Sequence, residues 1–142
     1  MRQTLVACLA AASLAAAAPA FAQGASAPRT TAAPAPLTQA QLLALGQRQF
    51  LQCRACHTLK PGEAHRTGPN LNGMFGAKAG TRPGYTYSAV LAGANVVWND
   101  DTLDHWLQNP TTFLKGNRMA FAGVPDAQRR AALIAYLRAE TR

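Results

Sequence analysis

The sequence predicts an all-α fold of about four or five helices joined by long loops. Helical hydrophobic periodicity recurs in several stretches, whereas the alternating pattern of a half-buried strand occurs nowhere in the chain. Residues 57–87 are rich in glycine and proline, and such a long loop is unusual in a compact domain unless it wraps something functional. The helices alone supply a thin hydrophobic core, so we expect a bound group to complete it.

The N-terminal segment, residues 1–22, has the pattern of a secretory signal peptide. A positive start precedes an almost uninterrupted apolar stretch, and Ala-Phe-Ala at residues 20–22 gives a small-x-small cleavage site. The apolar stretch is shorter than the roughly 20 residues of a spanning helix, which favours cleavage over a retained anchor. Cleavage would remove Cys8 and leave Cys53 and Cys56 in an exported, oxidising compartment.

The folded domain is expected to span residues 38–142. Residues 23–37 are small and proline-punctuated, and they cannot bury enough apolar area to offset their ordering entropy, so we interpret them as a flexible spacer. Thr38 and Gln41 have the spacing of a capping box ahead of an apolar helical pattern. This predicts a first helix that begins at Thr38 and ends near Cys53.

Three further helices are predicted after the long loop. Ser88 is a candidate N-cap for a short helix that ends near Gly93. The next helix is expected from Asn99 to Asn109, where Pro110 stops it, and residues 111–124 are predicted to be loop. A final helix follows residues 125–126, Pro-Asp. The apolar face of the helix from Asn99 consists of Leu103, Trp106 and Leu107. That of the final helix consists of Leu133, Tyr136 and Leu137.

Residues 53–57, Cys-Arg-Ala-Cys-His, form the C-x-x-C-H pattern of haem c attachment. Two thiols one helical turn apart can add to the two vinyl groups of haem, and the next residue then places an imidazole on the iron. A thioredoxin-type redox pair would need a βαβ context. A zinc site would need two further ligands, for which only His65 and His105 remain. The pattern therefore predicts one covalently bound haem c.

The second axial ligand of the iron decides between electron transfer and binding of small molecules. After removal of the signal peptide, Met74 and Met119 are the methionines that remain. The surroundings of Met74 are typical of a core side chain. A methionine in a loop, such as Met119, is usually core or surface as well, but a haem that lacks a sixth ligand makes it a candidate.

The folded part resembles a class I, mitochondrial-type cytochrome c of the kind found in bacterial periplasms. The resemblance extends over residues 46–137 in the family's order, and rests on residues 46–50, 53–57, 66–71, 84–88, 98, 107–110, 119–123 and 134–137. It implies the class I cytochrome c fold, with its loops wrapped around one covalently bound haem. It also implies that Cys53 and Cys56 tether the haem and that His57 and Met119 ligate its iron.

The resemblance implies supporting roles as well. The carbonyl of Pro69 would accept the other imidazole N–H of the proximal histidine and so fix the orientation of its ring. Tyr87 and Trp98 would donate hydrogen bonds to a buried haem propionate, which would otherwise be costly to bury. Gly46 and Tyr136 would lie where the first and last helices cross.

The sequence departs from the family at several positions. Residues 115–118 are Lys-Gly-Asn-Arg where the family usually has Pro-Gly-Thr-Lys, and the lost proline loosens the loop. Asn117 is expected to donate where the threonine hydroxyl does. Ala77 stands where an arginine near a propionate is usual, Leu91 replaces an asparagine, and Trp106 replaces a tyrosine.

The resemblance implies a soluble, monomeric, periplasmic carrier of single electrons rather than an enzyme. The alternatives are a haem-based ligand sensor and the electron-transfer subunit of a specific periplasmic oxidoreductase. A peroxidase would need a distal histidine, and neither His65 nor His105 has a suitable context. We expect both of these histidines to be exposed to solvent. No stable membrane insertion is expected after cleavage of the signal.

The formal net charge of +8 favours acidic partners. Glu63 is the one acidic residue between positions 39 and 99. We expect a positive rim around the haem edge that steers acidic redox proteins, such as a respiratory complex, an oxidase or a periplasmic dehydrogenase or reductase. Nucleic-acid binding is not expected, because the chain has no basic helix with stacking aromatics. The rim would consist of Arg48, Arg54, Lys60, Arg66, Lys78, Lys115 and Arg118.

Overall fold

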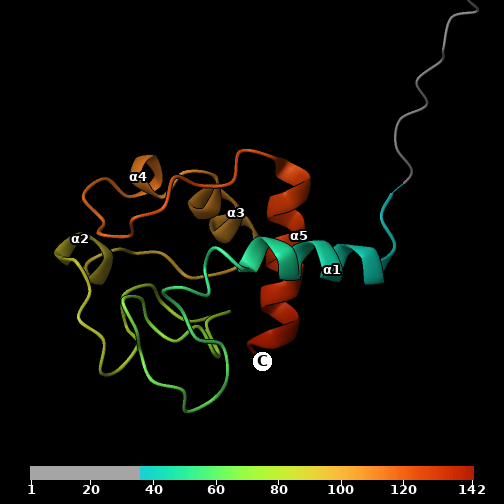
Figure 1. Cartoon of the computed structure of the whole chain (residues 1–142). Coiled ribbons are helices and arrows are strands. Elements are labelled where there is room, and N and C mark those ends of the chain that lie inside the picture. The colour runs from blue at the N-terminus through green and yellow to red at the C-terminus, as the bar shows by residue number, and fades with distance from the viewer. Residues whose placement is uncertain (1–35) are drawn as a thin grey trace, which may run out of the picture. The chain divides into compact units, whose positions relative to one another are not determined.

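The computed structural model describes residues 36–142, so the predicted signal peptide and nearly all of the predicted spacer lie outside the described residues. Five helices follow one another in the described chain: α1 (Gln39–Phe50), α2 (Ala89–Ala92), α3 (Asp100–Gln108), α4 (Pro110–Phe113) and α5 (Ala127–Glu140) (Figure 1). Residues 36–142 contain no strand, and one isolated bridge joins Lys78 to Val97. The all-α prediction is confirmed. No helix in this range is both long and apolar enough to cross a membrane.

Helix α1 begins as predicted and ends earlier. Thr38 and Gln41 form the capping box, in which each side chain bonds the backbone N–H of the other residue. The helix ends at Phe50, three residues short of the predicted end, but hydrogen-bonded turns continue through the cysteine motif. The N–H of Cys53 donates to Phe50 O at 2.9 Å, and the N–H of His57 donates to Cys53 O at 2.9 Å. These turns hold the motif on the end of α1.

Helices α1 and α5 cross each other (Figure 1). Gly46 is buried at the crossing, and a Cβ there would overlap Ala132 O and lie 2.6 Å from Tyr136 Cβ. The rings of Phe50 and Tyr136 pack beside it, with centroids 5.7 Å apart. Leu133 of α5 is fully buried. The close approach therefore requires glycine at position 46, in agreement with the sequence-based expectation.

The loop predicted for residues 111–124 is wrong at its beginning, where α4 (Pro110–Phe113) forms. Asn109 ends α3 and also caps α4, because its side chain accepts from the N–H of Thr112 at 3.1 Å. Pro110 occupies the first helical position, where its missing N–H costs nothing and its fixed φ favours the helix. The Asn-Pro pair therefore ends one helix and starts the next.

Two segments far apart in sequence pair within the long loop region. The N–H of Gly76 donates to Trp98 O at 2.8 Å, and the N–H of Trp98 donates to Ala77 O at 3.0 Å. The N–H of Ala79 donates to Val96 O at 2.8 Å. Because both the N–H and the carbonyl of Trp98 are hydrogen-bonded, the backbone position from which its indole extends is fixed.

A partly buried ion pair joins α3 to α5. The Arg130 guanidinium is almost fully buried, and it donates to both carboxylate oxygens of Asp104, at 2.8 and 3.1 Å. Its remaining nitrogen donates to Val124 O at 3.0 Å and Pro125 O at 2.8 Å. Arg130 therefore also fixes the segment that leads into α5.

We expect Asp104→Ala to lower the free energy of unfolding by about 1–3 kcal/mol, because it leaves a buried guanidinium without its carboxylate. Urea unfolding of the purified protein, followed by far-UV circular dichroism, measures this change. Asp101→Ala removes an exposed carboxylate from the first turn of the same helix and is expected to cost less than about 1 kcal/mol. Equal costs for the two variants would contradict a specific role for the ion pair.

Candidate functional site

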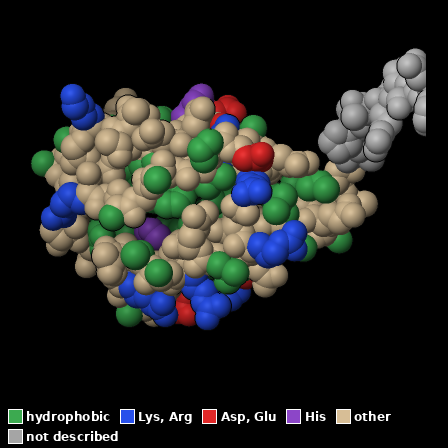
Figure 2. Space-filling view, turned by 45° about the horizontal axis from the view of Figure 1, so that its top comes forward, with side chains coloured by type: hydrophobic (Ala, Val, Ile, Leu, Met, Phe, Trp, Pro, Cys, Tyr) green, Lys and Arg blue, Asp and Glu red, His purple; other side chains and the backbone are tan. Residues whose placement is uncertain are grey.

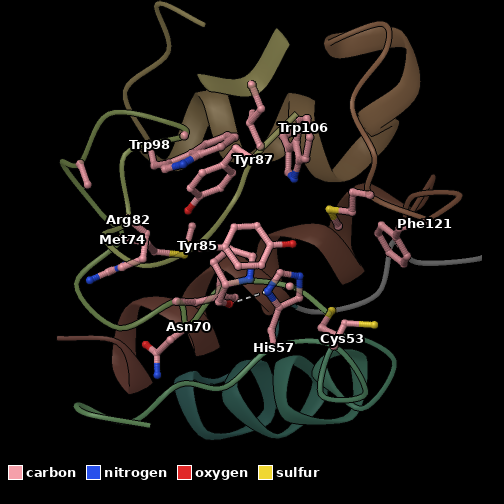
Figure 3. A pocket seen from close by; sticks show the side chains of 18 of the residues that line it. Cys53, His57, Asn70, Met74, Arg82, Tyr85, Tyr87, Trp98, Trp106 and Phe121 are labelled. Carbon is pink, nitrogen blue, oxygen red and sulfur yellow. Dashed lines mark hydrogen bonds between the residues drawn. The ribbon is translucent and has the colours of Figure 1, made fainter. Parts of the chain in front are cut away.

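A cavity of about 410 Å³ lies between the end of α1, the loops and helices α3 and α5 (Figure 3). Its volume is in the range of small-molecule and cofactor sites. Neither His65 nor His105 is among the residues that line it. All seven residues that were predicted from the sequence as site residues line this cavity: Cys53, Cys56, His57, Pro69, Tyr87, Trp98 and Met119.

The His57 imidazole is oriented by one hydrogen bond. Its Nδ1 lies 2.8 Å from Pro69 O, drawn as a dashed line in Figure 3. A carbonyl can only accept, so Nδ1 carries the proton and Nε2 keeps a free lone pair. Burial lowers the pKa of His57, although the bond to Pro69 opposes this shift. The ring is therefore held neutral, with Nε2 available to a metal.

Gly68 brings the following loop against the face of the imidazole. Its N–H donates to Cys56 O at 2.9 Å, which pins the loop to the cysteine motif. A Cβ at Gly68 would lie 2.7 Å from both Nδ1 and Nε2 of His57. Any larger residue there would have to displace the ring, so this glycine helps to set its position.

The two thiols lie half-buried beside the histidine. Cys53 and Cys56 are free in this structure and are separated by one hydrogen-bonded turn. Burial, and secondarily Cys56, raises the pKa of the Cys53 thiol to about 11. Two neighbouring thiols, a metal-competent nitrogen and a cavity of this size fit a porphyrin attached through both of its vinyl groups.

The opposite side of the cavity carries aromatic and hydroxyl groups. In Figure 3, Tyr87, Trp98 and Trp106 lie across the cavity from His57 and Cys53. Burial raises the pKa of Tyr87, although the backbone amide and guanidinium of Arg82 oppose this shift. The hydroxyl is therefore protonated at neutral pH and can donate a hydrogen bond.

Ser88 is a site residue that the sequence analysis missed, because its position suggested a helix cap. Its side chain makes no capping bond to α2. Its Oγ is buried on the cavity wall with no hydrogen-bond partner among the described residues. Buried hydroxyls are normally paired, so an acceptor is expected here, and a haem propionate would supply one.

Most of the remaining wall is apolar, which suits a flat macrocycle. Trp106 packs edge-on against Trp98, with ring centroids 5.5 Å apart, and against Phe113 at 6.0 Å. Met74 is 8% exposed and belongs to the hydrophobic core, as the sequence predicted, although it also lines the cavity. Met119 is partly buried and lies on the segment between α4 and α5.

The expectation that His65 is simply solvated is wrong. The N–H of Asn70 donates to His65 Nδ1 at 3.0 Å, so the proton is on Nε2, which donates to Pro83 O at 2.9 Å. The hydroxyl of Tyr85 also donates to Thr67 O. These bonds join the two loops that flank the cavity. His105 is exposed, as expected.

Basic side chains are spread over the surface seen in Figure 2, with fewer acidic ones among them. Lys78 and Arg118 of the expected rim line the cavity, as does Arg82, which the sequence analysis did not include. Lys60 is bound to Glu140 at 2.7 Å, which partly neutralises its charge. Lys78, Arg82 and Arg118 therefore mark the positive edge of the cavity.

Comparison with known proteins agrees with the geometry of the site. Over 97 residues the chain is 47% identical to cytochrome c of Sesamum indicum and 46% identical to cytochrome c of Gossypium barbadense, and each alignment covers 68% of this chain and 87% of the relative. It is 43% identical over 100 residues to cytochrome c of Chlamydomonas reinhardtii, which covers 70% of this chain and 89% of the relative. No protein-family model matches the chain.

Proposed function

The chain belongs to the cytochrome c family, whose members carry electrons on one covalently bound haem c, and on this premise we propose that it shuttles single electrons between periplasmic redox proteins. Cys53 and Cys56 would hold the haem through thioether links, and His57 and Met119 would ligate its iron. The observation that carries this proposal is the joint position of these side chains around one cavity.

A bound haem iron would supply a one-electron couple, which the residues of this chain would tune and shield. Pro69 holds the His57 ring in one orientation and raises the basicity of Nε2. The Met119 thioether would be the second iron ligand, and a thioether ligand favours the reduced state. Tyr87, Trp98 and Ser88 line the cavity and would donate hydrogen bonds to the propionates. A site filled in this way exchanges an electron with little rearrangement.

Reduced-minus-oxidised spectroscopy with potentiometric titration of the purified protein tests this proposal. We expect the sharp visible bands of a low-spin c-type haem and a single one-electron wave. The haem should stay with the polypeptide after acid–acetone extraction, because thioether bonds survive it. Haem that is extracted by this treatment, or a colourless protein from a host with intact maturation machinery, would contradict the proposal.

The periplasmic location rests on the N-terminal sequence, while the similar proteins cited above come from plants and an alga. Residues 1–22 are the proposed signal peptide, and residues 23–37 are the proposed spacer between it and the cytochrome domain. N-terminal sequencing of the protein from a bacterial periplasmic fraction should begin at Gln23. A mature protein that retains Met1 would contradict both cleavage and release from the membrane.

The proposed partners are acidic redox proteins that dock against the edge formed by Lys78, Arg82 and Arg118. We expect the second-order rate of electron transfer to an acidic partner to fall about tenfold or more between low and physiological ionic strength. Stopped-flow measurements over a salt series give this rate.

A matched pair of variants locates the effect. Lys78→Gln and Arg129→Gln each remove one positive charge from an exposed position, but only Lys78 lines the cavity. Lys78→Gln should lower the low-salt rate more than Arg129→Gln does. A flat salt profile, or equal effects of the two variants, would contradict steering toward this edge.

A further inference from the structure

The segment that carries Met119 is organised by one side chain. The amide nitrogen of Asn117 donates to Pro110 O at 2.8 Å and to Leu114 O at 2.9 Å. Its amide oxygen accepts from the backbone N–H of Met119 at 2.9 Å. Both amide protons are therefore used within the loop.

The local backbone explains why this side chain matters. Lys115 replaces the usual proline, and Gly116 adopts a positive φ of 89°, so neither residue restrains the chain. An asparagine side chain that bonds the N–H two residues ahead closes an Asx-turn, which fixes the intervening backbone. Through its two other bonds, Asn117 also attaches this turn to the start and end of α4.

The rest of the segment is attached through the backbone and through Arg118. The Arg118 guanidinium donates to Thr86 O at 2.9 Å, and the N–H of Val124 donates to Leu107 O at 2.8 Å. Among the described residues, Asn117 is the residue whose side chain bonds the Met119 backbone. Asn117 therefore supplies the side-chain bond that holds the Met119 backbone, beside the backbone bond from the Phe121 N–H to Met119 O at 3.0 Å.

We propose that Asn117 is the positioning residue for Met119, a side-chain latch that replaces the missing loop proline and keeps the thioether directed into the cavity. This inference rests on the proposed function, in which Met119 ligates the iron. Loss of the latch leaves the covalent attachment of the haem intact but increases the fraction of molecules in which Met119 has left the iron. A competing ligand then binds more tightly in proportion to that fraction.

Imidazole binding to the oxidised haem protein measures this fraction, because imidazole can enter only where Met119 has left. We expect Asn117→Ala to raise the apparent imidazole affinity about tenfold or more, as follows from the loss of hydrogen bonds that hold the loop. The far-red thioether-to-iron absorption should weaken in parallel. Asn117→Thr should give an intermediate affinity, because a hydroxyl closes the same turn more weakly and cannot reach both carbonyls.

Asn99→Ala is the matched control. Asn99 caps α3 by accepting from the N–H of Thr102 at 2.8 Å, so this variant loses a comparable bond away from the Met119 segment. It should lower the stability of the protein without changing the imidazole affinity. An equal rise in Asn99→Ala and Asn117→Ala would overturn the proposal, since the effect would then reflect general loosening.

Two further outcomes separate this inference from the proposed function. Met119→Ala should bind imidazole more tightly than any Asn117 variant, and a wild-type affinity in Met119→Ala would overturn the ligand assignment itself. If Asn117→Ala yields no folded haem protein, Asn117→Thr carries the test. A wild-type imidazole affinity in the folded Asn117 variant would overturn the positioning role.

Discussion

The Met119→Ala variant is expected to lose the far-red absorption of the oxidised protein and to bind carbon monoxide when reduced. Removal of the thioether leaves the sixth position of the iron open, and an open position binds small ligands. The reduction potential should fall by on the order of 100 mV or more, because a thioether stabilises the reduced iron. Absorption spectroscopy and potentiometry measure both effects.

Met74→Leu is the matched control for this result. Met74 also lines the cavity but belongs to the buried core, and leucine is close to it in volume. This variant should keep the far-red band and exclude carbon monoxide. If the band disappears in Met74→Leu and survives in Met119→Ala, the ligand has been assigned to the wrong methionine. Carbon monoxide binding by the wild-type protein would favour the ligand-sensor alternative.

Gly46→Ala is expected to destabilise the protein by about 3 kcal/mol or more, which can prevent folding altogether. The new methyl group would overlap the backbone oxygen of Ala132 and lie 2.6 Å from Tyr136 Cβ, so α1 and α5 would have to separate. Backbone cannot move aside as a flexible side chain can, and the rings of Phe50 and Tyr136 beside the crossing would lose contact.

Guanidinium unfolding of the haem protein measures the effect at Gly46, with Gln47→Ala as control. Gln47 is the next residue on α1 and is exposed, so alanine there should leave stability within about 0.5 kcal/mol or raise it slightly. A cost for Gly46→Ala close to that of Gln47→Ala would mean that the helices are not in close contact at this point.

Features set by neighbouring residues could be predicted from the sequence. The spacing of Thr38 and Gln41 predicted the capping box of α1, and the residue types at Asn99 and Asp126 predicted the starts of α3 and α5. The cysteine motif is equally local. The resemblance to cytochromes c then nominated Tyr87 and Trp98, which line the cavity as expected.

Features that depend on contacts distant in sequence could not be predicted in this way. The ion pair of Asp104 with Arg130 and the bond from His65 to Pro83 join residues that no periodicity relates. Ser88 has the residue type of a helix cap, and only the folded chain places its hydroxyl on the cavity wall. The three bonds of Asn117 are local in sequence, but they depend on how α4 ends, which the sequence pattern did not predict.

The crossing of α1 with α5 has a consequence for biosynthesis. The two helices, Gln39–Phe50 and Ala127–Glu140, lie at opposite ends of the domain in sequence. Their contacts therefore join residues with a large sequence separation. A chain under synthesis cannot form this crossing until α5 has emerged from the ribosome. The cysteine motif, which directly follows α1, therefore stays without this packing partner until residues 127–140 are available.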